Sequence, residues 1–306
     1  MTADLLVVGA GPAGLSAGTF ANRAGLETTV IESESIGGEL VNRPSIEDLP
    51  GHRPIAGTEL RSTLVERFED AGGSITLGTV ERIETDGDDE PFRVTTSAGE
   101  GLVRAVVLAT GGTPAPLGVP GEESFEGRGV LHCATCDGPL YAGETVAVAG
   151  SSDWAVADAL SLAEHADRVV LFEPTDALEA REELRERLVE HPDVEVRTGT
   201  EIVDLDGDDV LERLTLLDRA DGTESVESVG GLYVQQGVDP ATDPFADVVS
   251  LTDDGEIVVD AGLATDTPGM FAAGDVRQSS SRTVAGAIGD GATAARSAAA
   301  YVERNR

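Results

Sequence analysis

The chain has 306 residues, enough for two domains of ordinary size. Its 21 basic residues are all arginine and stand against 57 acidic ones, which gives a formal net charge of −36 at pH 7. The lack of lysine excludes Schiff-base and phosphate-loop lysine chemistry, and the negative charge argues against nucleic acid or an anionic membrane as a partner.

The acidic composition predicts a solvated surface over a normal core, because 40% of the residues are hydrophobic. Such a surface is typical of halophilic, archaeal cytoplasmic proteins, and colloidal stability in ordinary salt is the alternative interpretation. No uncharged apolar run is long enough to span a bilayer, and the first apolar stretch, residues 5–15, is rich in glycine and follows no basic residue. We therefore expect a cytoplasmic protein.

The first predicted elements form a dinucleotide-binding unit. An apolar strand over residues 4–8 runs into a G-x-G-x-x-G turn at Gly9–Gly14, followed by a helix pattern and a second strand over residues 28–32. The glycines would let the backbone approach a pyrophosphate at the positive end of the helix. Glu32, at the end of the second strand, would bind two ribose hydroxyls.

The same arrangement recurs in a degraded form in the middle of the chain. A strand over residues 145–149 ends at Gly150, and after a helix pattern a second strand ends at Glu173. Glu173 follows Gly150 by 173 − 150 = 23 residues, as Glu32 follows Gly9 by 32 − 9 = 23 residues. The equal spacing predicts two similar nucleotide-binding folds, of which only the first kept its glycines.

The only two cysteines of the chain, Cys133 and Cys136, stand in a C-x-x-C pattern just before the second unit. Such a pair can close and reopen a disulfide, and Asp137 is placed to handle the accompanying proton. A zinc site is the alternative, but it needs two further ligands, and of the four histidines only His132 stands nearby. The pattern favours redox chemistry and no metal.

These motifs together resemble the low-molecular-weight thioredoxin reductase family, over essentially the whole chain. The matching segments are the fingerprint at 9–14, G-G-E-L at 37–40, I-E-D-L-P-G at 46–51, A-T-G at 109–111, C-A-T-C-D-G at 133–138 and G-M-F-A-A-G-D at 269–275. Arg282-Thr283 stands where the family has Arg-Gln.

The resemblance implies an α/β fold of two Rossmann-like three-layer nucleotide-binding domains, the second inserted into the first. An FAD domain would comprise residues 1–116 and 242–306, and the inserted domain, residues 117–241, would carry the cysteine pair. The implied FAD-binding residues are Gly9, Gly11, Pro12, Ala13, Gly14, Glu32, Gly38, Glu39, Leu40, Asp48, Thr110, Gly111, Gly274, Asp275, Arg282, Thr283 and Val284.

The resemblance also implies roles for the redox motif. Cys136 would face the flavin, Cys133 would attack the disulfide of a thioredoxin-like partner, and Asp137 would serve as acid. A homodimer is the implied oligomer.

The second nucleotide site departs from the family pattern. Ser152 replaces a glycine next to the expected pyrophosphate, and Trp154 replaces a small hydroxyl residue after Gly150. Where the family has arginines for the 2′-phosphate of NADPH, this chain has Glu173-Pro174-Thr175 and Glu179. A charge pair at about 4 Å is worth about 4 kcal/mol at an effective dielectric of 20, so the sequence predicts that NADPH is a poor donor.

The sequence is compatible with several electron paths. The favoured one is reduction of the flavin by a protein such as ferredoxin, and NADH bound through Glu173 is the first alternative. Oxidation of small dithiols with transfer to oxygen is another, and a non-enzymatic flavin redox sensor is a hypothesis of a different class.

Overall fold

The computed structural model describes residues 2–43, 45, 46, 48–85, 87, 90–131 and 134–305. The chain divides into two compact units, one made of residues 1–113 and 239–306 and the other of residues 114–238. The expected boundaries at 116/117 and 241/242 lie within a few residues of this division. The chain passes between the units in β7 (Gly112–Pro114) and β16 (Val238–Pro240), which pair with each other.

The first unit contains a sheet in the order β3-β2-β1-β6-β5-β4, with β17 also paired to β6. Strands β1, β2, β3, β6 and β17 are mutually parallel, whereas β4 and β5 are antiparallel to their neighbours. The strands are β1 (Thr2–Val8), β2 (Thr28–Glu32), β3 (Ser74–Leu77), β4 (Val80–Glu84), β5 (Phe92–Thr96), β6 (Gly99–Leu108) and β17 (Met270–Ala272). The helices are α1 (Pro12–Arg23), η1 (Gly38–Asn42), α2 (Gly57–Asp70), η3 (Asp243–Phe245) and α7 (Val284–Arg304).

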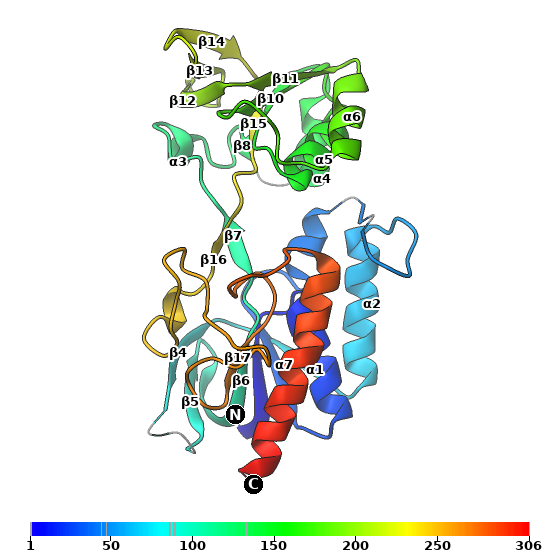
Figure 1. Ribbon diagram of the computed structural model, residues 1–306, viewed down its shortest axis with the longest axis vertical. Helices are drawn as coiled ribbons and strands as arrows, with labels where there is room; N and C mark the ends of the chain where they lie inside the picture. The colour runs from blue at the N-terminus through cyan, green and yellow to red at the C-terminus, as the bar shows by residue number, and fades with distance from the viewer. Residues whose placement is uncertain are drawn as a thin grey trace. The chain divides into compact units, whose positions relative to one another are not determined.

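Both faces of this sheet are covered. Buried residues of α1 and α7 pack on one face, around Leu5, Val7 and Val107, and these helices lie side by side in Figure 1. On the other face, buried residues of β1, β6, β5 and β4 pack together with the segment that contains Phe245 and Ile257. The strands are nearly continuous apolar runs because a parallel sheet of this kind is buried on both sides.

The second unit repeats the plan on a smaller scale. Its parallel sheet has the order β11-β10-β9-β15-β8, and β12, β13 and β14 form a separate antiparallel sheet. The strands are β8 (Val130–Leu131), β9 (Thr145–Ala149), β10 (Arg168–Glu173), β11 (Val194–Thr198), β12 (Thr200–Asp206), β13 (Arg213–Asp218), β14 (Glu224–Ser228) and β15 (Gly231–Val234). The helices are α3 (Glu122–Phe125), α4 (Ala134–Asp137), η2 (Gly138–Tyr141), α5 (Asp153–Leu162) and α6 (Glu182–Glu190).

In this unit α5 and α6 cover one face of the parallel sheet and the antiparallel sheet covers the other (Figure 1). The prediction of two Rossmann-like units, one inserted into the other, is confirmed. Among the described residues no helix is long and apolar enough to cross a membrane.

Candidate functional site

The first glycine turn joins β1 to α1 and leaves one side open. A Cβ atom on Gly9, whose φ is +102°, would lie 2.3 Å from the carbonyl oxygen of Ala109, and one on Gly14 would lie 1.9 Å from the carbonyl oxygen of Gly9. A Cβ on Gly11 would meet no atom within 4 Å. Gly11 is also the N-cap of α1 and supplies no side-chain cap. The positive end of α1 therefore faces space that a phosphate group can enter.

The acidic residue of this unit is fixed at the end of β2. Glu32 is 8% exposed, and its two carboxylate oxygens accept hydrogen bonds from the backbone N–H groups of Ala10 at 2.7 Å and Glu34 at 2.8 Å. These bonds hold the carboxylate beside the glycine turn, where a ribose hydroxyl can donate to a remaining lone pair.

The structure brings distant FAD-binding candidates to this turn. A Cβ on Gly274 would lie 2.9 Å from the Cβ of Ala13, and a Cβ on Gly38 would lie 3.3 Å from the Cα of Gly11. Thr110 follows β6, and its Cα is 3.2 Å from the position of a Cβ on Gly9. Four segments of the first unit thus meet at one place.

A small cluster joins the remaining apolar candidates. Leu40 of η1 and Val284, the first residue of α7, are buried together with Ile46, Leu49 and Leu60. This cluster holds the 38–40 segment against the start of α7.

Two residues that were not predicted from the sequence, Ser280 and Asp290, hold the segment that contains Gly274 and Asp275. Ser280 donates a hydrogen bond from its hydroxyl to Asp275 at 2.8 Å, and burial raises the pKa of the Asp275 carboxyl. Asp290 accepts the backbone N–H of Gly274 at 3.1 Å and forms a two-pronged ion pair with Arg277. The bidentate Arg–carboxylate geometry keeps Gly274 and Asp275 in place.

Other candidates lie at the surface and are engaged with protein groups. Glu39 pairs with Arg43 at 3.3 Å, and Arg282 pairs with Glu256 at 3.1 Å. Asp48 is exposed. The Thr283 hydroxyl oxygen caps α7 by accepting the backbone N–H of Gly286 at 3.1 Å, as expected for an N-cap threonine.

The residues of the first unit fit a bound FAD. The uncapped N-terminus of α1, the open side of Gly11 and the fixed Glu32 carboxylate supply places for a diphosphate and a ribose. The remaining candidates, Gly111 and Pro12, lie in the same turns: Gly111 has φ +61°, and Pro12 is the first residue of α1, where proline is favoured.

The second unit repeats the backbone of the first turn. A Cβ on Gly150 would lie 2.3 Å from the carbonyl oxygen of Gln235. A Cβ on Gly9 would lie at the same distance from the carbonyl oxygen of Ala109. Gly150 donates to the carbonyl of Phe172 at 3.2 Å, and Gly9 donates to that of Ile31 at 2.7 Å. The internal repeat predicted from spacing is thus present in the main-chain contacts.

The two turns differ where a pyrophosphate would lie. Ser152 occupies the N-cap of α5, and its hydroxyl oxygen accepts the backbone N–H of Ala155 at 3.3 Å. This side chain stands at the position that is open at Gly11. The helix N–H that a phosphate would use already has a protein partner.

The loop after β10 folds back on the same turn. Ala180 donates its backbone N–H to the carbonyl of Ser151 at 2.8 Å. Arg181 donates its backbone N–H at 2.8 Å and its Nε–H at 2.6 Å to the carboxylate of Asp153. The arginine next to the expected 2′-phosphate position is therefore engaged with the first turn of α5.

The acidic candidates of the second unit occupy different environments. Glu173 is 6% exposed at the end of β10 and accepts the backbone N–H of Thr175 at 2.9 Å, as Glu32 does from Glu34. Glu179 is exposed. Trp154 is half-buried and is the second residue of α5, directly after the turn that Gly150 begins.

The redox motif is described only in part. His132 and Cys133, and the side chain of Cys136, lie outside the described residues. Asp137 ends α4, and burial raises the pKa of its carboxyl. Burial, and next the charge of Asp137, raise the pKa of the phenols of Tyr141 and of the fully buried Tyr233.

Asp158 extends the polar groups near Tyr233 into α5. Its side chain is 2% exposed and accepts a hydrogen bond from the Gln235 amide at 2.6 Å. Its charge also raises the pKa of Tyr233. The apolar strand pattern around Tyr233 gave no signal of these polar contacts.

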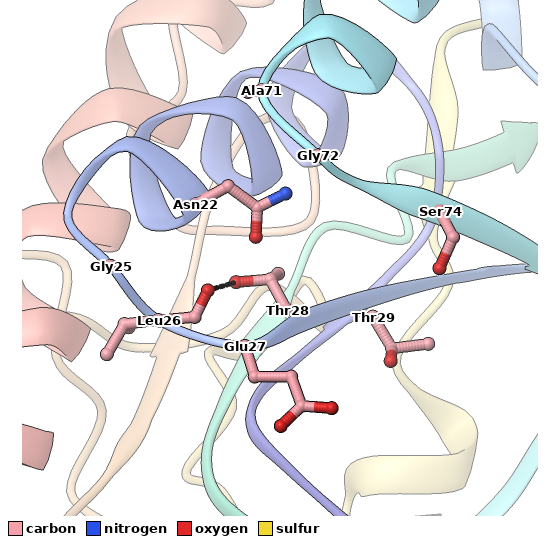
Figure 2. A pocket seen from close by; sticks show the side chains of 9 residues that line it. All are labelled: Asn22, Gly25, Leu26, Glu27, Thr28, Thr29, Ala71, Gly72 and Ser74. Atoms are coloured by element: carbon pink, nitrogen blue, oxygen red, sulfur yellow. Dashed lines mark hydrogen bonds between the residues drawn. The ribbon is translucent and has the colours of Figure 1, made fainter.

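Neither a metal site nor a surface depression adds to this chemistry among the described residues. No group of three or more His, Cys, Asp or Glu side chains among them is arranged to hold a metal ion. An open depression of about 460 Å³ lies at the first residues of β2 and β3. Figure 2 shows the residues that line it: Asn22, Gly25, Leu26, Glu27, Thr28, Thr29, Ala71, Gly72 and Ser74. Ligands of such sheets bind at the carboxyl ends of the strands, the opposite edge.

Comparisons with known proteins agree with this architecture. The sequence pattern of the pyridine nucleotide-disulphide oxidoreductase family matches residues 3–291. The thioredoxin reductase of Listeria monocytogenes is 34% identical over 302 residues, which cover 98% of this chain and 94% of that protein. The crystal structure of the Lactococcus lactis thioredoxin reductase matches with a TM-score of 0.96 and 31% identity over 99% of both chains.

A structure named a ferredoxin-flavin thioredoxin reductase, from Clostridium acetobutylicum, matches with a TM-score of 0.53 and 28% identity, over 99% of this chain and 98% of that one. The chain therefore belongs to the thioredoxin reductase family of pyridine nucleotide-disulphide oxidoreductases, and it is an FAD-dependent thiol-disulphide oxidoreductase.

Proposed function

We propose that this enzyme passes electrons from FAD through Cys136 and Cys133 to the disulfide of a thioredoxin-type protein, and that its electron donor is not NADPH. The C-A-T-C-D-G motif and the thioredoxin reductase relatives support the acceptor. The observation that carries the donor assignment is the Ser152 hydroxyl, which caps α5 where a pyrophosphate would bind.

FAD supplies two-electron redox chemistry when bound. Two electrons and two protons open the Cys133–Cys136 disulfide to two thiols. The Cys133 thiolate then attacks the partner disulfide, a mixed disulfide forms, and Cys136 resolves it. The products are the closed Cys133–Cys136 disulfide and the partner's dithiol, so electrons and protons balance.

Asp137 is the proposed acid of this exchange. Its raised pKa keeps a proton on the carboxyl at a higher pH than in water, which suits a group that must deliver a proton to a leaving thiolate. Burial raises the pKa of the Tyr233 and Tyr141 phenols, which makes them weaker acids than the Asp137 carboxyl.

A protein donor of the ferredoxin type is the favoured source of electrons. The loop of residues 174–181 carries no arginine until Arg181, and Asp153 engages that guanidinium. The exposed Glu179 adds a negative charge where NADPH would bring its 2′-phosphate. A related structure bears the name of a ferredoxin-flavin thioredoxin reductase, which supports a donor of this class.

NADH is the second candidate, because one observation favours it. Glu173 lies at the end of β10 as Glu32 lies at the end of β2, and an acid there suits two free ribose hydroxyls. The Ser152 cap and the half-buried Trp154 beside it oppose this reading.

Anaerobic flavin reduction distinguishes the donors. The holoenzyme in high salt is mixed separately with NADPH, NADH and chemically reduced ferredoxin, and the flavin absorbance is followed. We expect bleaching by ferredoxin and none by NADPH at micromolar concentration. Rapid bleaching by NADPH contradicts the donor proposal, bleaching by NADH alone selects the second candidate, and bleaching only by small dithiols points to an oxidase.

The cysteine roles are tested separately. Cys136→Ser should retain reduction of the flavin and lose turnover with thioredoxin. Cys133→Ser should do the same, because either substitution removes the disulfide that carries the electrons. Turnover with thioredoxin in either variant would contradict the relay, whatever the donor.

The acidic surface and the assembly are part of the proposal. We assign the enzyme to a salt-rich cytoplasm and expect a homodimer, on the charge of −36 and on the family resemblance respectively. Light scattering in 2–3 M KCl measures the mass directly, and a monomer of 31.6 kDa would contradict the dimer.

A further inference from the structure

Arg61, on α2, carries a guanidinium group with no protein partner among the described residues. Its stem lies across the Gly37 turn, since a Cβ on Gly37 would be 2.6 Å from Cγ and 2.9 Å from Cδ of Arg61. The Nε atom is buried and makes no hydrogen bond. A buried polar group without a partner is costly, so its retention needs an explanation.

The other arginines around these turns are matched with acids. Arg43 pairs with Glu39 at 3.3 Å, Arg277 with Asp290 at 2.7 Å, and Arg282 with Glu256 at 3.1 Å. Arg61 forms no such ion pair within the part of the chain that the structure describes. In a chain of net charge −36, a cation that pairs with no acid of the described residues is unusual near the cofactor turns.

The place of Arg61 relates it to the expected diphosphate. Gly37 donates its N–H to the carbonyl of Ala10 at 2.9 Å, and the Gly38 position approaches Gly11 as described above. The turn that carries the stem of Arg61 therefore packs on the turn whose open side admits a phosphate. The fixed carboxylate of Glu32 next to it would repel a diphosphate, and a nearby cation would offset that repulsion.

We propose that the guanidinium of Arg61 binds the diphosphate of FAD and adds a positive charge to that of the N-terminus of α1. The planar donor fork of arginine suits two phosphate oxygens. The proposal concerns cofactor binding and does not depend on which donor reduces the flavin.

Release of FAD from the holoenzyme tests the proposal. Arg61→Met, Arg61→Lys and the control Arg67→Met, an exposed arginine on the same helix, are diluted, and free FAD is measured by its fluorescence. We expect the Kd for FAD to rise about 10- to 100-fold in Arg61→Met, as for loss of a charge-assisted hydrogen bond, and to stay within about twofold in Arg67→Met. Arg61→Lys should fall between them.

Competition identifies the group that Arg61 contacts. ADP and adenosine are each used to displace FAD, and Arg61→Met should weaken ADP about tenfold while leaving adenosine unchanged. The effect should shrink as KCl rises, because salt screens the charge. An unchanged FAD Kd, or equal weakening of ADP and adenosine, overturns the proposal. If Arg61→Met does not fold, Arg61→Lys and Arg61→Gln decide by the same measurements.

Discussion

The hydroxyl oxygen of Ser152 accepts the backbone N–H of Ala155 and caps α5 at 3.3 Å. Gly11 leaves the equivalent helix end of the first unit without a side-chain cap. The two turns therefore differ by the hydroxymethyl group of Ser152. The turn at Gly11 can receive a diphosphate, whereas in the turn at Ser152 a backbone N–H group of the helix end already has a hydrogen-bond partner.

Removal of this cap should open the second turn at little cost in stability. Ser152→Gly should lower the free energy of unfolding by only a few tenths of a kcal/mol, because glycine is tolerated at an N-cap. Ser152→Gly combined with Trp154→Thr should raise the rate of flavin reduction by NADH about tenfold, since the helix end is freed for a phosphate. Stopped-flow absorbance measures the rate.

NADPH provides the control for that variant. Glu179 remains, so flavin reduction by NADPH should stay slower than by NADH in the variant. Equal rates with the two nucleotides would show that charge near the 2′-phosphate plays no part in the selection. No gain for either would mean that the cap and the tryptophan do not limit access.

The protonation of Asp137 should set the alkaline limit of thioredoxin reduction. Burial raises its pKa, so the neutral acid persists to higher pH and is lost as pH rises through the folded-state value. The rate of dithiol–disulfide exchange should fall over that interval, and Asp137→Asn should lower the rate and remove that limb of the pH profile. Stopped-flow exchange with oxidised thioredoxin measures it, and an unchanged profile in the variant would exclude Asp137 as the acid.

The same shift has a consequence for stability. Burial disfavours the charged carboxylate, so its contribution to stability is present at low pH and is lost as pH rises through the raised pKa. Thermal unfolding of Asp137→Asn against wild type should therefore show a smaller loss of stability on the alkaline side. Asp253→Asn, at an exposed acid in the other unit that is not among the FAD-binding candidates, serves as the control.

A closed set of four ion pairs should stabilise the second unit. Arg197 contacts Glu195 at 2.6 Å and Glu227 at 2.7 Å, and Arg168 contacts the same two acids. Arg197 also lies 5.6 Å from the centroid of the Phe172 ring. Because the groups are partly exposed, Arg197→Met should cost about 1 kcal/mol of unfolding free energy in low salt and less in high salt.

The pH dependence of this network has the opposite sign to that of Asp137. Hydrogen bonds from Arg197 and then Arg168 lower the pKa of Glu195, so its stabilising effect is present above the unfolded-state pKa and is lost as pH falls through the folded-state value. Urea unfolding of wild type and Arg197→Met at neutral and acid pH measures the difference. A difference that does not shrink at acid pH would contradict this account.

Salt should stabilise the whole protein. The net charge of −36 repels itself in the compact state, and screening shortens from about 10 Å at 0.1 M to about 3 Å at 1 M salt. The unfolding temperature of the holoenzyme should rise steadily with KCl from 0.1 to 3 M. A flat profile would contradict the assignment of the acidic surface to a salt-rich setting.

The sequence by itself determined the features that depend on local pattern and spacing. The glycine turn at Gly9, its repeat at Gly150 and the acids that end the second strands were all predicted, and the structure has both turns. Strand, glycine turn and helix are encoded within a few residues, so their order can be read without a fold. The family followed from the same motifs.

The tertiary structure decided what each of these residues contacts. Gly274 approaches Ala13, Ser152 caps α5 and Asp153 engages Arg181 because of packing between segments or because of side-chain direction. The same holds for Arg61, whose buried Nε has no hydrogen-bond partner among the described residues. Periodicity carries no information on such contacts, because they are fixed by packing between elements. The sequence shows an acidic chain whose only basic side chains are arginines. The fold decides, position by position, whether an arginine pairs with an acid of the chain or can bind an anion.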